Sequence, residues 1–188
     1  FLLNNIFSVH QDLPPGEVLD LLDESVVRTL RQTEDDSISK DGMDVSLCKV
    51  IFESKTMQYS GAHRPLYYID THKSEIEEPL EEIKGDKMPV GGGQYKNRGA
   101  FANHERPYQE GDMVVIFSDG LPDQFGGPDN RKFSPKRIRD IIKANLTVPM
   151  MQLNDAIEEE LKVWMRIGVP GVDPVKQTDD ILVIGVRF

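Results

Sequence analysis

The stretch Met113-Val-Val-Ile-Phe-Ser-Asp-Gly-Leu-Pro-Asp123 combines a short apolar run with a polar turn. Five consecutive apolar residues are typical of a strand that is buried on both faces. The pair Asp119-Gly120 then takes the chain out of the core, which places a carboxylate near the surface at a strand end. Pro122 and the later pair Gly126-Gly127 predict an irregular loop beyond it. Because most Asp-Gly turns are only solvated turns, this segment alone does not identify a site.

A second acidic segment precedes the last apolar run of the chain. Asp179 and Asp180 stand directly before residues 181–186, for which we expect a closing strand. Neighbouring carboxylates repel each other, and a hard divalent cation relieves that repulsion. Carboxylate and water ligands without histidine or thiolate suit Mg²⁺ or Mn²⁺. Acidic residues at a strand start are also commonplace, so this segment too is ambiguous when taken alone.

The order of the elements indicates the fold class. Apolar residues recur at helical spacing in residues 17–31 and 150–165, and Ser134 followed by Pro135 is typical of an N-cap with proline at the first helical position. Helices at both ends of the chain therefore flank a run of strands, which predicts an α+β fold with helices outside an antiparallel core. The expected strands lie at 45–52, 56–60, 66–69, 75–80 and 101–108, and the polar stretch 33–40 is expected to be a loop.

Composition sets limits on the class of protein. The chain has 188 residues, 38% hydrophobic and 29% charged, which fits one folded domain with its own core. A net charge of -10 disfavours nucleic acid as a partner, and no apolar run approaches the roughly 20 residues of a membrane-spanning helix. Cys48 is the only cysteine, which excludes an internal disulfide and makes a reducing cytoplasm the simplest compartment. Its neighbours alternate as in a strand, so we expect Cys48 to be a packing residue.

Five segments, taken in order, carry a resemblance to a known family. The five segments are Asp41-Gly-Met-Asp44, Tyr59-Ser-Gly-Ala-His-Arg-Pro65, Pro89-Val-Gly-Gly92, Gly111-Asp112 leading into Ser118-Asp119-Gly120, and Thr178-Asp179-Asp180. With them, the chain resembles the SpoIIE/RsbU branch of the metal-dependent protein phosphatase (PPM) family over nearly its whole length. The segment Asp123-Gln-Phe-Gly-Gly127, with Trp164, is similar to the SiaA-like, receptor-linked subgroup of that branch.

The resemblance implies a fold and an activity. It implies a four-layer α-β-β-α sandwich of antiparallel sheets flanked by helices, forming a single phosphatase domain over residues 1–188 at the C-terminal end of a larger regulatory protein. The implied activity is hydrolysis of phosphoserine or phosphothreonine on a partner, such as an anti-sigma-factor antagonist, by metal-activated water. The alternative left open is a catalytically degenerate phosphatase-fold module that binds a partner protein. A two-metal nuclease or phosphodiesterase is disfavoured by the net charge of -10.

The resemblance also implies a metal site with two Mg²⁺ or Mn²⁺ ions. Asp119 and Asp179 match metal ligands of the family and are the expected catalytic residues, while Asp123, Asp180 and Gly120 are further candidates for metal binding. The family's other ligands lie in an early aspartate pair and an Asp-x-x-Gly-His-Gly turn, and neither occurs here. We therefore expect the N-terminal part of the domain to be missing and about half of the site to be present.

Other features of the family carry weaker expectations. His63 and Arg64 lie in a turn between expected strands, where a structural role is favoured over catalysis. The resemblance implies a cytoplasmic location, with membrane attachment only through an upstream region. Some relatives dimerise, and the sequence leaves open whether this chain forms a homodimer.

Overall fold

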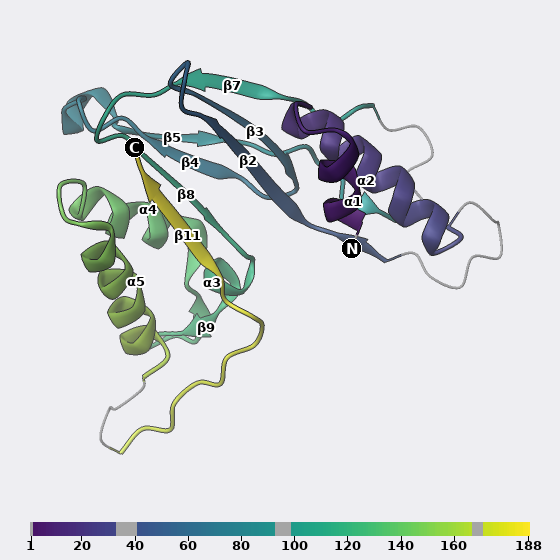
Figure 1. Cartoon of the computed structure of the whole chain (residues 1–188). Helices are drawn as coiled ribbons and strands as arrows, with labels where there is room; N and C mark the ends of the chain where they lie inside the picture. Colours follow the sequence, from purple (N-terminus) through teal and green to yellow (C-terminus); the bar gives the residue numbers. More distant parts are fainter. Residues whose placement is uncertain (1, 33–40, 93–98, 167–170) are drawn as a thin grey trace. The chain divides into compact units, whose positions relative to one another are not determined.

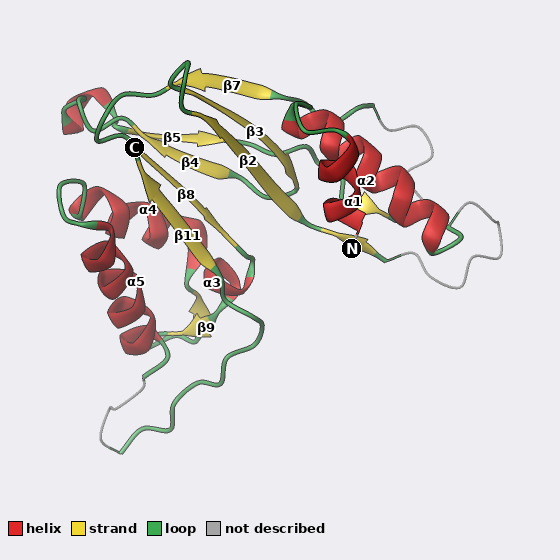
Figure 2. Ribbon diagram, in the orientation of Figure 1, coloured by secondary structure: helices red, strands yellow, loops and turns green. Residues whose placement is uncertain are grey.

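The computed structural model describes residues 2–32, 41–92, 99–166 and 171–188. These residues form two compact units (Figure 1). Unit 1 comprises Phe1–Leu66 and Glu82–Gln109, and unit 2 comprises Tyr67–Glu81 and Glu110–Phe188. Each unit has a sheet and helices (Figure 2). Each also has a hydrophobic core of its own.

Unit 1 is built on a three-stranded antiparallel sheet. The strands β2 (Val45–Ile51), β3 (Thr56–Ala62) and β7 (His104–Pro107) lie in the order β2-β3-β7. Two helices, α1 (Leu2–Val9) and α2 (Pro15–Thr29), pack against each other, and α2 contacts β2 and β3. A short antiparallel pair, β1 (Gly42–Met43) with β6 (Val90–Gly91), lies beside α2. The buried face of α2 repeats at helical spacing through Val18, Leu19, Leu22 and Val26, as the sequence predicts.

Unit 2 is built on a four-stranded sheet in the order β11-β8-β4-β5. Its strands are β11 (Val183–Arg187), β8 (Met113–Phe117), β4 (Leu66–Ile69) and β5 (Leu80–Ile83). β8 pairs antiparallel with both β4 and β11, and this central position explains its apolar sequence.

The other elements of unit 2 surround this sheet. They are the 3-10 helix η1 (Glu75–Glu77), α3 (Gly120–Asp123), the β9 (Phe125–Gly126) and β10 (Arg131–Lys132) hairpin, α4 (Ser134–Ala144) and α5 (Met150–Trp164). Apolar residues of α4 and α5 join the sheet in one core, in which Ile138, Ile142 and Leu153 are almost completely buried. Burial of each such side chain stabilises the fold by about 1.5–3 kcal/mol.

The structure confirms the α+β class with antiparallel sheets flanked by helices. Two local predictions are wrong. Residues 75–77 form a 3-10 turn instead of a strand, because the backbone N–H and hydroxyl of Ser74 both donate to the carboxylate of Glu77. Ser134 is the first residue of α4 and Phe133 is its N-cap, whereas Pro135 stands in the first turn as expected. The expected loop at 33–40 lies outside the described residues.

Cys48 is a partly buried residue of β2. Its Sγ lies 4.0 Å from Sδ of Met57 on the neighbouring strand. Burial raises the pKa of the Cys48 thiol to about 11, so the thiol is neutral at physiological pH and a poor nucleophile. These features fit the packing role that the sequence predicts. Among the described helices, none is both long and apolar enough to cross a membrane.

Candidate active site

The segment around Asp119 and the segment of Asp179 and Asp180 meet where β8 ends and β11 begins. We call this end of the two strands in unit 2 the acidic edge. β8 and β11 are antiparallel neighbours, so the end of β8 lies beside the start of β11 (Figure 1). Ser118 joins them: its backbone N–H donates to the carbonyl of Leu182 at 3.0 Å, and its hydroxyl donates to the carbonyl of Asp180 at 2.8 Å. The same hydroxyl accepts the N–H of Leu182 at 2.9 Å. The segments that carry Asp119 and Asp180 are therefore fixed against each other.

Gly120 permits this close approach. A Cβ at residue 120 would lie 2.3 Å from the carbonyl oxygen of Asp180, which leaves no room for any side chain. Asp119 has helical backbone angles and precedes α3, and its carbonyl accepts the N–H of Asp123 at 3.0 Å. The loop that the sequence predicts beyond Asp119 therefore begins with the short helix α3, and Asp119 and Asp123 lie one helical turn apart.

Asp179 lies in a local turn just before β11. Its Oδ1 accepts the N–H of Asp180 at 2.7 Å, and its carbonyl accepts Nε2 of Gln177 at 2.7 Å. Asp179 and Asp180 are both exposed, whereas Asp119 is partly buried. These two hydrogen bonds tie the side chain and the carbonyl of Asp179 to its neighbours in the turn.

Gln124 stabilises the candidate site through hydrogen bonds that the sequence does not reveal. Its side chain is completely buried, its Oε1 accepts the N–H of Thr178 at 3.2 Å, and its Nε2 donates to the carbonyl of Lys176 at 3.0 Å. Its backbone carbonyl accepts the N–H of Phe133 at 2.8 Å and Nε1 of Trp164 at 3.2 Å. Gln124 therefore fixes the segment leading to the acidic pair. Only its place directly after Asp123 hinted at such a role.

We expect Gln124→Met to lower the free energy of unfolding by about 1–3 kcal/mol. Methionine keeps the volume of the side chain but leaves the N–H of Thr178 and the carbonyl of Lys176 without this partner. Urea unfolding of the two proteins measures the difference. Gln152→Met on the exposed face of α5 is the matched control and should leave stability unchanged. An equal loss of unfolding free energy in both variants would show that the hydrogen bonds of Gln124 do not stabilise the fold.

Asp123 is held by a cation. Its Oδ2 lies 3.0 Å from Nζ of Lys132 in β10, and both side chains are about half exposed at 52%. An exposed ion pair of this kind contributes at most about 1 kcal/mol, so the carboxylate of Asp123 can exchange Lys132 for another cation. Lys132 also connects the acidic edge to the β9–β10 hairpin.

The His63 turn in unit 1 has a structural role. Asp44 lies 2.9 Å from Nδ1 of His63 and accepts hydrogen bonds from Nε of Arg64 at 3.0 Å and from its Nη2. The hydroxyl of Tyr59 donates to the carbonyl of Arg64. Both turn side chains thus serve to fix the turn onto Asp44, which fits the structural role expected for them.

The donor set of the acidic edge fits part of a shell for a hard divalent cation. Asp119, Asp179 and Asp180 offer only carboxylate oxygens, the ligands that Mg²⁺ and Mn²⁺ prefer. Within the residues that the structure describes, no three His, Cys, Asp or Glu side chains form a group that could hold a metal ion. The structure therefore brings the acidic segments together through their backbones and does not gather the candidate side chains, Asp123 among them, into such a group.

The fold and this edge define an α+β protein whose antiparallel strand ends present carboxylates. Comparison with protein families is specific: residues 3–188 match the family of Stage II sporulation protein E (SpoIIE). The chain belongs to the SpoIIE family. No curated protein matches it.

Solved structures of phosphatase domains share the fold. The SiaA-PP2C domain of Pseudomonas aeruginosa is 24% identical with a TM-score of 0.80, and the match covers 100% of this chain and 66% of that one. The PP2C domain of SpoIIE from Bacillus subtilis with a regulatory fragment is 14% identical with a TM-score of 0.64, covering 99% and 48%. RsbX in complex with magnesium is 14% identical with a TM-score of 0.58, covering 97% and 69%. This chain thus spans about two thirds of the SiaA domain and about half of the SpoIIE protein.

Proposed function

We propose that the chain is part of a metal-dependent protein serine/threonine phosphatase that acts on a phosphorylated regulatory protein. One observation carries the proposal: Ser118 and Gly120 bind the Asp119 segment to the Asp179-Asp180 segment at one sheet edge. Membership of the SpoIIE family and the PP2C phosphatase fold support it.

The roles of the residues follow from their chemistry. Asp119 and Asp179 would hold Mg²⁺ or Mn²⁺, with Asp180, Asp123 and Gly120 as further contacts, and the related RsbX is described in complex with magnesium. When bound, the metal would supply an activated water for hydrolysis of the phosphoester. Ser118 and Gln124 would keep the acidic segments in register. The preferred ligand chemistry of carboxylates fits this division of roles.

The partner and location are parts of the same proposal. The substrate class is a protein that carries phosphoserine or phosphothreonine, similar to an anti-sigma-factor antagonist, as the resemblance to the SpoIIE/RsbU branch implies. A cytoplasmic location and the assignment of residues 1–188 to one domain stay predictions, and whether the chain forms a homodimer stays open.

Metal removal tests the proposal. Phosphate release from a phosphoserine protein by the full-length natural protein with Mn²⁺ is expected to fall by more than about 100-fold when the metal is chelated, because no other group on the acidic edge activates water. Adding Mn²⁺ back should restore the rate. Equal release with and without chelator would contradict the proposal. No release together with tight binding of the phosphoprotein would favour the alternative, a partner-binding module.

A further inference from the structure

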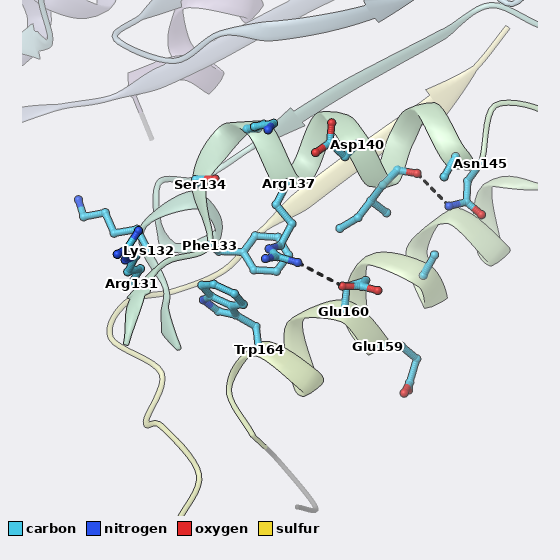
Figure 3. A pocket seen from close by; sticks show the side chains of 14 residues that line it. Arg131, Lys132, Phe133, Ser134, Arg137, Asp140, Asn145, Glu159, Glu160 and Trp164 are labelled. Atoms are coloured by element: carbon cyan, nitrogen blue, oxygen red, sulfur yellow. Dashed lines mark hydrogen bonds and ion pairs between the residues drawn. The ribbon is translucent and has the colours of Figure 1, made fainter. Parts of the chain in front are cut away.

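A groove between α4 and α5 lies next to the acidic edge of unit 2. It has a volume of about 640 Å³, within the range of ligand sites, and is lined by residues of β10, α4 and α5 (Figure 3). The ion pair between Lys132, which lines the groove, and Asp123 links it to the predicted metal residues at 3.0 Å. Gln124 strengthens the connection, because its carbonyl binds the groove residues Phe133 and Trp164.

The groove has a rigid middle. The guanidinium carbon of Arg137 lies 4.2 Å from the ring centroid of Trp164 and 5.6 Å from that of Phe133. Nη1 of Arg137 lies 3.7 Å from Oε2 of Glu160 on α5, as the dashed line in Figure 3 shows. The two aromatic rings pack edge to face at an interplanar angle of 80°. A stacked and paired arginine of this kind is preorganised, so the groove needs little reordering on binding.

The charges of the groove are unusual for this chain. Residues 131–139 contain five of its 22 Lys and Arg residues and no Asp or Glu, although the net charge is -10. A negative net charge repels a phosphorylated protein. A local cationic patch at residues 131–139, beside the acidic edge, attracts such a protein and offsets that repulsion. The exposed members of the patch that line the groove are Arg131, Lys132 and Lys136.

The other end of the groove is acidic. Asp140 and Glu159 line the groove beyond the pair of Arg137 with Glu160, and Figure 3 shows Arg131 and Lys132 on the opposite side of the aromatic pair from Glu159. These carboxylates repel an extended polyanion such as nucleic acid or an anionic lipid surface. A polypeptide with acidic residues on only one part of its length fits both ends.

We propose that this groove binds the polypeptide segment next to the phosphorylated residue of the substrate, with acidic side chains of that segment at Arg131, Lys132 and Lys136. The proposal rests on the proposed phosphatase function, which it extends by naming a substrate determinant: acidic residues beside the phosphoserine or phosphothreonine.

Charge reversal at the basic end tests the groove. Arg131→Glu with Lys136→Glu is introduced into the full-length natural protein, and this variant is compared with the unchanged parent protein. The substrates are two phosphoserine peptides, one flanked by Asp and Glu and one flanked by Lys, and p-nitrophenyl phosphate. KM for the acidic peptide should rise by about tenfold or more, while turnover of the small ester stays unchanged. The control is Lys73→Glu with Lys87→Glu, which reverses two exposed lysines outside the groove and should change neither.

A second measurement does not depend on catalysis. Trp164 is the only tryptophan of the chain, so its fluorescence reports occupation of the groove. Titration of the chain with the acidic phosphopeptide should change the emission, with a Kd that rises about tenfold in the double reversal variant. Unchanged KM and Kd, or no change in emission on binding, would overturn the proposed groove while leaving the phosphatase proposal intact.

Two further outcomes separate the proposals. If the parent protein releases no phosphate, the phosphatase proposal fails, and the fluorescence titration still decides whether the groove binds the acidic peptide. An equal response to a DNA oligonucleotide or to vesicles of anionic lipid would show an unspecific anion surface and would overturn the assignment to a polypeptide.

Discussion

Replacement of Asp119 by Asn is expected to lower Mn²⁺-dependent phosphate release by more than about 100-fold and to leave the fold intact. The amide is nearly isosteric with the carboxylate but lacks the charge that binds a divalent cation. Loss of residues that merely orient metal ligands already costs about 10–100-fold, so loss of a ligand should cost at least as much. Asp119 is only partly buried, and the exchange keeps the size and shape of its side chain, so stability should change little.

The measurement needs a matched exchange elsewhere. Asp155→Asn on the exposed face of α5 makes the same chemical change away from the acidic edge and should keep full activity. Phosphate release and thermal unfolding are measured for both variants over a range of Mn²⁺ concentrations. If Asp119→Asn keeps the parent rate at saturating Mn²⁺, Asp119 is not a metal ligand.

The sequence predicts those elements whose signal is local. β8 and α2 follow from an apolar run and from helical periodicity, and the structure has both within two residues of the expected limits. The strand expected around 75–80 lies instead at Leu80–Ile83, because a side-chain hydrogen bond between Ser74 and Glu77 stabilises a turn that alternation of residues does not reveal.

The contacts that build the candidate site are less accessible from sequence. Asp119 and Asp179 stand out because each adjoins an apolar strand, but the pairing of β8 with β11 is what brings their segments together. Ser118 and Gln124 act through hydrogen bonds to residues more than 50 positions away in the chain. No periodic pattern encodes a partner at that separation, so the sequence shows both residues only as members of segments that resemble the family, and the three-dimensional structure shows what they bind.

Gly120→Ala is expected to damage both stability and activity, in contrast to Asp119→Asn. The added methyl group would lie 2.3 Å from a backbone oxygen of Asp180, an atom that cannot rotate away, so the two acidic segments must separate. Overpacking of this kind lowers the free energy of unfolding by about 1–3 kcal/mol. A shift of about 1 Å between groups that act together lowers a rate by on the order of 100-fold.

Urea unfolding and phosphate release distinguish this effect from a general cost of alanine. Gly99→Ala is the control, because a Cβ at Gly99 meets no atom within 4 Å. That variant should match the parent in both measurements. A Gly120→Ala protein that is destabilised but hydrolyses phosphoserine at the parent rate would mean that contact between residues 120 and 180 supports the fold alone. Loss of both together ties the spacing of the two strand ends to the chemistry, because the alanine removes no charge and no hydrogen-bonding side chain.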